Sequence, residues 1–311
     1  MRSANTPTVL KMVRAPFFSS ILAPLVAGTL LSIFIQGSFN PLGFVLVLIL
    51  GIGLHTATNV YNDIYDTLQG SDKINVHRNE FSGGSGVLVD HPDLLPKMYW
   101  LARLGLAFAV GATTGLMLVV RKDFWLLLWA LTLVSIFFSK YYTAAPVQLG
   151  YRGLGEVSVW FAFGPMAILV ASVSQNVGFH PIVLVAMPAT GISTLSILLI
   201  GQMIDLPADR ATGKLGCVAR LGIARVRYLY LAVQLILMLD VVVLVSAMGM
   251  TSWPVLSCLL PYAILMPAIW RKLHHDYKNP ASLKTAAKIN VLLHLLFSLL
   301  YSLGIGIALF L

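Results

Sequence analysis

Long apolar stretches alternate with short polar gaps along the whole chain. A helix needs about 20 apolar residues to cross the hydrocarbon of a bilayer. Cutting the sequence at its polar gaps and at Pro and Gly gives nine such stretches. The predicted membrane-spanning helices cover residues 16–36, 41–64, 98–120, 123–142, 155–174, 181–204, 226–249, 252–271 and 287–310. The pattern therefore predicts an all-α, polytopic membrane bundle of nine helices, with a single domain over residues 1–311.

Composition supports a membrane protein and excludes two other classes. Of the 311 residues 58% are apolar and 11% charged, and mean hydropathy is +0.85. A soluble domain carries about 25% charged residues, which is more than twice the charged share of this chain. The two cysteines, Cys217 and Cys258, have no spacing partner, which excludes a disulfide framework and a cysteine zinc site.

The positive charges lie on one side of the predicted bundle. With nine spans, the N-terminal tail and the loops after the second, fourth, sixth and eighth helices share a side. That side carries 19 of the 21 Lys and Arg residues, and only Arg121 and Lys122 lie on the other. Because Lys and Arg favour cytoplasmic loops, we expect a cytoplasmic N-terminus and an external C-terminus. The net charge of +9 is thus a topology signal, and no nucleic-acid patch is expected.

Ten of the twelve acids lie on the same side, many of them at the end of the second predicted helix. Asn59, Asp63 and Asp66 are spaced i, i+4 and i+7, so they share a helix face if the helix continues. Stacked carboxylates repel one another unless a cation lies between them, and Mg²⁺ takes such oxygen ligands. A solvated acidic helix end is the alternative, which we disfavour because acids at membrane depth are costly. The cluster comprises His55, Asn59, Asn62, Asp63, Asp66 and Asp72.

A second acidic cluster ends the sixth predicted helix, with Gln202, Asp205 and Asp209. Asp205 and Asp209 are i, i+4 neighbours, although Pro207 between them could kink the helix or start a new turn. The second and sixth helices emerge on the same side of the bundle. Two acidic clusters facing each other there can hold Mg²⁺ ions and a diphosphate between them.

Basic residues near the clusters are candidates for binding the remaining phosphate charge. Each of them is also at a position where a cation can simply extend from the bilayer to the interface. The candidates are Arg14, Lys73, Arg78 and Lys140.

These segments together resemble the UbiA-type superfamily of intramembrane prenyltransferases. The segment 59–73, NVYNDIYDTLQGSDK, is similar to the first aspartate motif of the superfamily, and 205–214, DLPADRATGK, to the second. The GxD ending of the first motif and the following SGGSGVL, 82–88, resemble the 1,4-dihydroxy-2-naphthoate branch. The segments 140–146 and 153–156 match the connection between helices four and five.

The resemblance implies a nine-helix bundle around a central cavity, in which Mg²⁺ grips a polyprenyl diphosphate. It implies prenyl transfer to an aromatic acceptor, 1,4-dihydroxy-2-naphthoate, in menaquinone biosynthesis, at a site that faces the cytoplasm. The implied metal ligands are Asn59, Asn62, Asp63, Asp66, Asp72, Asp205 and Asp209. Catalysis is assigned to Asp63, Asp66, Asp205, Asp209 and Lys140, and substrate binding to Arg14, His55, Asn59, Lys73, Arg78, Tyr142 and Gln202.

Several alternatives stay open from the sequence. His55 orients an acceptor hydroxyl, acts as a base or is a buried histidine bonded to a neighbouring helix. The same fold could serve another acceptor or cyclise the isoprenoid. A secondary transporter is the alternative from another class, but it would place its acids near the bilayer midplane.

Overall fold

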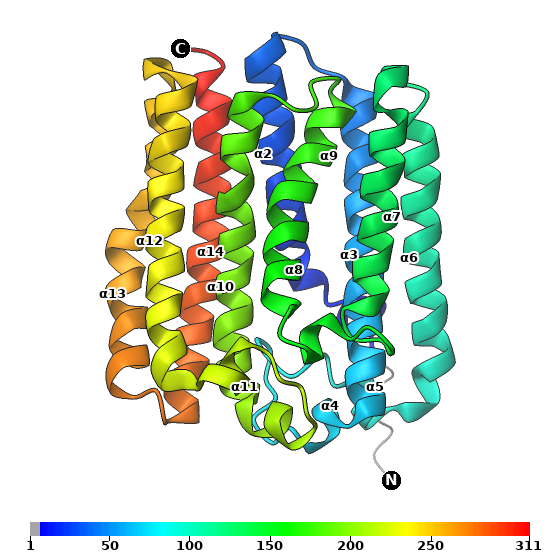
Figure 1. The fold of residues 1–311 in the computed structure, drawn as a ribbon, viewed down its shortest axis with the longest axis vertical. Coiled ribbons are helices and arrows are strands. Elements are labelled where there is room, and N and C mark those ends of the chain that lie inside the picture. Colours follow the sequence, from blue (N-terminus) through cyan, green and yellow to red (C-terminus); the bar gives the residue numbers. More distant parts are fainter. Residues whose placement is uncertain (1–6) are drawn as a thin grey trace.

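The computed structural model describes residues 7–311, which form a bundle of long helices standing side by side (Figure 1). No β-strand forms among these residues, and an isolated bridge joins Asn79 and Ser82 in a loop. The all-α prediction is confirmed. Arg2, counted among the cytoplasmic cations, lies outside the described residues.

Eight helical segments within residues 7–311 are long and apolar enough to cross a membrane. Some are built from consecutive helices, such as α8, a π-helical turn and α9. These segments are Ala15–Gln36 (with α2, Ser19–Gln36), α3 (Pro41–Gln69), Lys122–Tyr141 (with α7, Trp125–Tyr141), Gly155–Ser174 (α8, Gly155–Phe161; π turn, Ala162–Met166; α9, Ala167–Ser174), α10 (Pro181–Ala211), α12 (Ile223–Met248), Met250–His275 (with α13, Leu260–His275) and α14 (Pro280–Ala308).

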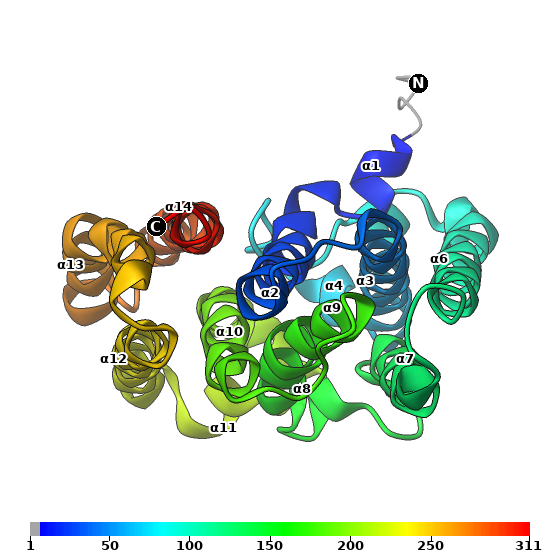
Figure 2. The same cartoon turned by 90° about the horizontal axis from the view of Figure 1, so that it is seen from above.

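The ninth predicted span is the helix α6, Leu95–Leu116. It packs along α3 but is less apolar than the other eight segments, because it carries Lys97 and Arg103. Seen from above, α6 and α7 flank α3, while α12, α13 and α14 pack on the far side of α10 (Figure 2). The crossing of the membrane by α6 remains a prediction.

The helices α3 and α10 both run further than the apolar pattern predicts, and both extensions carry acids. The helix α3 begins at Pro41 after the N-cap Asn40 and ends at the left-handed Gly70, so the whole segment 59–69 is helical. The helix α10 continues through Pro207 to Ala211. Pro207 is exposed and removes only one backbone donor, so the helix persists there. Asp205 and Asp209 therefore keep their i, i+4 relation.

Short helices gather at one end of the bundle, opposite the C-terminus (Figure 1). The loop between α3 and α6 contains α4 (Ser71–Ile74) and α5 (Val87–Asp90), and α11 (Cys217–Leu221) follows α10. These segments cover the ends of α3 and α10, where the polar clusters lie.

Candidate active site

A cavity of about 190 Å³ lies between α3 and α10 at the end of the bundle covered by the short helices. We call it the polar chamber. The helix α3 contributes His55, Thr58, Asn59, Asn62 and Asp66 to its wall. The facing helix α10 contributes Gln202, Asp205 and Asp209. The two acidic clusters, 146 positions apart between Asn59 and Asp205, thus share one chamber.

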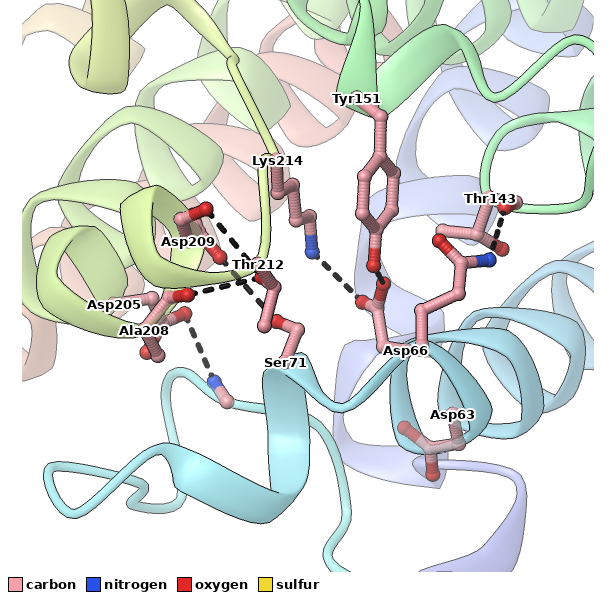
Figure 3. Close-up of polar contacts among 12 residues, drawn as sticks. Asp63, Asp66, Ser71, Thr143, Tyr151, Asp205, Ala208, Asp209, Thr212 and Lys214 are labelled. Atoms are coloured by element: carbon pink, nitrogen blue, oxygen red, sulfur yellow. Dashed lines mark hydrogen bonds and ion pairs between the residues drawn. The ribbon is translucent and has the colours of Figure 1, made fainter.

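Asp66 makes two strong contacts that connect the two clusters (Figure 3). Lys214, in the loop after α10, places its Nζ 2.7 Å from Asp66 Oδ2, and Tyr151 donates its hydroxyl to Asp66 Oδ1 at 2.8 Å. Burial alone would lower the pKa of Lys214, but the carboxylates of Asp66 and Asp209 raise it well above its ordinary value. Lys214 is therefore a permanent cation on the wall of the chamber.

Asp205 and Asp209 hold the loop that follows α3. Asp205 Oδ1 accepts a hydrogen bond from Asn75 Nδ2 at 2.7 Å, and Asp205 Oδ2 accepts one from the backbone of Gly83 at 3.0 Å. Asp209 Oδ1 accepts a longer one from the Ser71 hydroxyl, at 3.4 Å. The second cluster thus fixes residues 71–83 across the mouth of the chamber.

Two carboxylates of the first cluster keep an oxygen without a partner. Asp63 Oδ1 accepts from the backbone of Ser85 at 3.0 Å, but Asp63 Oδ2 and Asp72 Oδ2 are buried and bond to nothing among residues 7–311. Both carboxylates lie against Gly84, where φ is +70° and a Cβ would meet them. Burial, followed by the charges of Asp66 and Asp63, raises the pKa of Asp72 to about 8.

The donor chemistry of this region fits Mg²⁺. Within the described part of the chain, no three His, Cys, Asp or Glu side chains already converge as a metal site. The chamber nevertheless offers oxygen donors, from the amides Asn59 and Asn62 and from Asp66, Asp72, Asp205 and Asp209. Asp72 lines the chamber and Asp63 does not, but both carboxylates lie against Gly84 of its wall, and each has an oxygen without a partner among residues 7–311. Oxygen donors with unpaired negative charge are what Mg²⁺ binds.

Among the four predicted basic ligands, only Arg14 lines the chamber. Lys73 is exposed, because Ser71 and Asp72 occupy the buried side of the short helix α4. Arg78 pairs with Asp90 at 3.4 Å and packs under Gly86.

Lys140 is also outside the wall of the chamber, and its Nζ lies over the ring of the adjacent Tyr141. The geometry therefore does not support Lys73, Arg78 and Lys140 as phosphate ligands. Lys214 lines the chamber instead.

Sequence reasoning missed two contacts of the site. Lys214 was visible as the last residue of the second motif, yet its reach back to Asp66 depends on how the loop folds. Nothing in the sequence marks Tyr151 as a contact of the site, since it belongs to a short turn, Leu149–Tyr151, that is far from both clusters along the chain.

Gln202 is held in one orientation by Glu156. Gln202 Nε2 donates to Glu156 Oε1 at 2.7 Å, and the backbone of Cys217 donates to the same oxygen at 2.6 Å. Because a carboxylate only accepts, the amide nitrogen of Gln202 must face Glu156. The Oε1 atom of Gln202 is left buried without a partner among the described residues.

Away from the acids the chamber continues into an apolar extension. A second cavity of about 70 Å³ shares His55, Thr58, Tyr142, Val159 and Phe163 with the polar chamber. Leu54, Phe138 and Ala162 form further parts of its wall. A long apolar group attached to a polar head fits this shape.

Comparison with known proteins identifies relatives along most of the chain. The model of the UbiA prenyltransferase family matches residues 21–296. A 1,4-dihydroxy-2-naphthoate octaprenyltransferase from Mycobacterium tuberculosis is 30% identical over 209 residues, covering 67% of this chain and 68% of that protein. A 2-carboxy-1,4-naphthoquinone phytyltransferase from Synechocystis is 28% identical and covers 96% of this chain and 92% of its own.

Solved structures with the same fold share little sequence with this chain. An apo UbiA homolog from Aeropyrum pernix superposes with a TM-score of 0.65 at 18% identity, covering 93% of this chain and 97% of its own. A UbiA homolog from Archaeoglobus fulgidus bound to GPP and Mg²⁺ has a TM-score of 0.61 at 14% identity, covering 94% and 99%. At these identities the likeness concerns the fold.

Proposed function

The chain belongs to the UbiA prenyltransferase family, and from that premise we propose that it transfers a polyprenyl group from polyprenyl diphosphate to 1,4-dihydroxy-2-naphthoate in menaquinone biosynthesis. It is a prenyltransferase and a multi-pass integral membrane protein. The observation that carries the proposal is the polar chamber with its apolar extension, which matches a diphosphate head with a hydrocarbon tail.

The acceptor is proposed from the relatives. Those from Mycobacterium tuberculosis and Escherichia coli are named as 1,4-dihydroxy-2-naphthoate octaprenyltransferases, and that from Synechocystis as a naphthoquinone phytyltransferase. Their shared acceptor class is a naphthalene ring with two oxygen substituents. Family membership removes the transporter alternative, while transfer to another acceptor and cyclisation are outcomes of the experiment below.

We propose Mg²⁺ as the cofactor, because the oxygen donors of the chamber fit it and a homolog was solved with GPP and Mg²⁺. When bound, Mg²⁺ would neutralise the charge that develops on the departing diphosphate. The residues proposed to hold it are Asn59, Asn62, Asp63, Asp66, Asp72, Asp205 and Asp209.

The protein's own cations bind the rest of the phosphate charge. Lys214 and Arg14 both line the chamber, and the raised pKa of Lys214 keeps it charged throughout the physiological range. Binding of the diphosphate would draw Lys214 away from Asp66 and free that carboxylate. Once Lys214 and Arg14 contact the bound diphosphate, their positive charges stabilise the negative charge that develops as the diphosphate departs.

In the proposed reaction the C1–O bond of the prenyl diphosphate breaks, and its electron pair leaves with the diphosphate. The electron-rich ring of the acceptor forms the new bond to C1. Loss of the ring carboxylate as CO₂ returns the electron pair of its C–C bond to the ring. The apolar walls near Val159 and Phe163 exclude water from the allylic cation.

We further propose that the chamber faces the cytoplasm, with the N-terminus cytoplasmic, the C-terminus external and one domain throughout. The support is that 19 of the 21 Lys and Arg residues belong to one side of the predicted topology. The chamber is lined by Ser71 and Asp72 of α4 and by Asp209 of α10, and α4 lies at the end of the bundle opposite the C-terminus (Figure 1).

The test uses purified full-length protein in detergent with Mg²⁺ and geranylgeranyl diphosphate. Parallel reactions contain 1,4-dihydroxy-2-naphthoate, 4-hydroxybenzoate or no acceptor, and products are identified by mass. The proposal expects a prenylated naphthoquinol with release of CO₂ and diphosphate. Transfer only to 4-hydroxybenzoate, or a cyclised hydrocarbon without acceptor, would overturn the proposed acceptor.

A further inference from the structure

His55 is a buried histidine whose ring has no hydrogen-bond partner in the described part of the chain. Its side chain is 6% exposed, and neither Nδ1 nor Nε2 bonds to any group among residues 7–311. The backbone of Phe17 approaches the ring without making a hydrogen bond. A buried polar group without a partner is destabilising, so a ligand that supplies the missing partner explains the arrangement.

His294 is a second buried histidine in the same bundle, and both of its ring nitrogens have hydroxyl partners. Its Nδ1 lies 2.9 Å from the Ser193 hydroxyl and its Nε2 lies 3.4 Å from the Ser20 hydroxyl. Its ring is as buried as that of His55. The hydroxyl of Thr58, which lines the same cavities as His55, instead lies within hydrogen-bond distance of Leu54 O, at 2.8 Å, and Ser139 Oγ, at 2.9 Å. The ring of His55 is thus left free in a region that has partners to offer.

His55 lies where the polar chamber meets its apolar extension, since it lines both cavities. Its ring makes edge contacts with Phe18 and Phe163, with ring centroids 5.5 and 5.4 Å away. On α3 it precedes Asn59 by about 6 Å and Asp66 by about 16 Å of helix rise. A diphosphate at the acids and a tail in the extension would place the reacting carbon between these two ends.

The chemistry of the imidazole selects the ligand. A neutral histidine carries one N–H donor and one acceptor nitrogen. A prenyl tail offers neither group, and a diphosphate oxygen only accepts. A phenolic hydroxyl both donates and accepts, and its aromatic ring suits the slot beside Phe18 and Phe163.

We propose that His55 binds a ring hydroxyl of the aromatic acceptor and holds the acceptor ring next to the reacting carbon of the prenyl donor. This assignment rests on the proposed prenyl transfer to a dihydroxynaphthoate. It makes His55 a specificity-determining residue for the acceptor and gives it no part in binding the diphosphate.

The first test compares His55→Phe, which keeps an aromatic ring but has no hydrogen-bonding atoms, with His55→Gln, which restores a donor and an acceptor. Loss of one buried hydrogen bond predicts an increase of about tenfold in the acceptor KM for His55→Phe. The donor KM should stay within about twofold, and His55→Gln should recover most of the acceptor affinity. Equal changes in both KM values, or no change in either, would overturn the assignment.

A second test uses the wild-type protein and covers the case in which His55→Phe does not fold. The acceptors 1-hydroxy-2-naphthoate and 4-hydroxy-2-naphthoate each lack one hydroxyl of the parent compound. One of them should compete with the parent about tenfold less well, while the other competes like the parent. If both compete as well as the parent compound, no ring hydroxyl is bound and the assignment fails.

His294→Gln is the matched control, because it also replaces a buried histidine on a membrane-spanning helix. It should lower the melting temperature without changing the acceptor KM. Failure of the proposed function is distinguishable, since wild-type protein would then transfer nothing to a naphthoate acceptor, which overturns both proposals. Wild-type transfer with an unchanged acceptor KM in folded His55→Phe overturns only this one.

Discussion

The two acidic clusters resemble each other in sequence but differ in how their carboxylates are used. In the second cluster, both oxygens of Asp205 accept hydrogen bonds from the loop after α3. In the first cluster, Asp63 and Asp72 each keep one buried oxygen without a partner among residues 7–311. Asp63 and Asp72 thus each keep an oxygen free for a ligand, whereas Asp205 uses both of its oxygens to hold the loop that covers the chamber.

Asp66 is the exception within the first cluster, because Lys214 and Tyr151 occupy both of its oxygens. Each cluster is therefore tied to the loop that follows the other. The contacts that tie the clusters to the two loops all involve charged groups of the chamber. A residue can consequently matter for ligand binding, for loop closure or for both, and substitutions should separate these roles.

The largest loss is expected from the carboxylates with unpaired oxygens. Asp63→Asn and Asp72→Asn each preserve the shape of the side chain but cannot form a carboxylate, and prenyl transfer should fall at least about 10³-fold because the proposed Mg²⁺ site loses an anionic ligand. Melting temperatures should change little, since an amide of the same shape replaces the buried carboxyl group. Product formation and thermal unfolding measure the two effects. Near-normal transfer in both variants would contradict the division of roles.

A smaller loss with a structural signature is expected from Asp205→Ala. It removes the acceptor for Asn75 and Gly83, so the loop should open. Hydrogen exchange of residues 75–86 should accelerate, and transfer should fall by about 10²-fold because the chamber is no longer closed. Asp63→Asn is the control, since it should leave exchange at residues 75–80 unchanged. Loss of activity without faster exchange would assign Asp205 to ligand binding alone.

Lys214→Met and Lys140→Met compare the lysine that lines the chamber with the lysine that the sequence predicts as a phosphate ligand. Lys214→Met leaves Asp66 without its ion pair and removes a cation from the chamber, so the donor KM should rise by about tenfold or more. Lys140→Met should leave it within about twofold, because Lys140 does not line the chamber. Titration with geranylgeranyl diphosphate gives both values. The reverse order would restore the sequence-based assignment of Lys140.

The smallest effect on activity is expected from Pro207→Ala. The helix α10 already continues through Pro207, so Asp205 and Asp209 should keep their positions and transfer should stay within about twofold. The melting temperature should rise, because alanine restores a backbone donor in a helix interior. A large loss of activity would show that Pro207 shapes the second cluster.

The sequence predicted the helical bundle because an apolar stretch long enough to cross a membrane is a one-dimensional signal. The acids were recognisable for a related reason, since charge is scarce in such a chain and Asp63, Asp66, Asp205 and Asp209 stand at helix ends. The continuation of α3 and α10 into the polar segments was not predicted, because hydropathy locates the membrane boundary and not the end of the helix. Asn40 and Gly70 as helix caps define the ends of α3.

The cations that line the chamber were harder to predict, because the fold of the loops determines which side chains reach it. Lys73, Arg78 and Lys140 lie next to motif residues in the sequence. The side chains of neighbouring residues on a short helix, or at the end of a helix, nevertheless point in different directions. Lys214 and Tyr151 reach Asp66 from 148 and 85 positions away. Contacts of this length depend on packing, and no spacing rule in a single sequence encodes them.

The most direct test of the central claim measures whether both clusters bind one diphosphate. The probe is a non-reactive thiolo analogue of geranylgeranyl diphosphate, whose dissociation constant is measured with and without Mg²⁺ for wild type, Asp63→Asn and Asp209→Asn. Each substitution should weaken Mg²⁺-dependent binding at least about tenfold, as expected when a charged ligand is lost. Wild-type affinity in either variant, or binding to the wild type that is the same without Mg²⁺, would contradict the account.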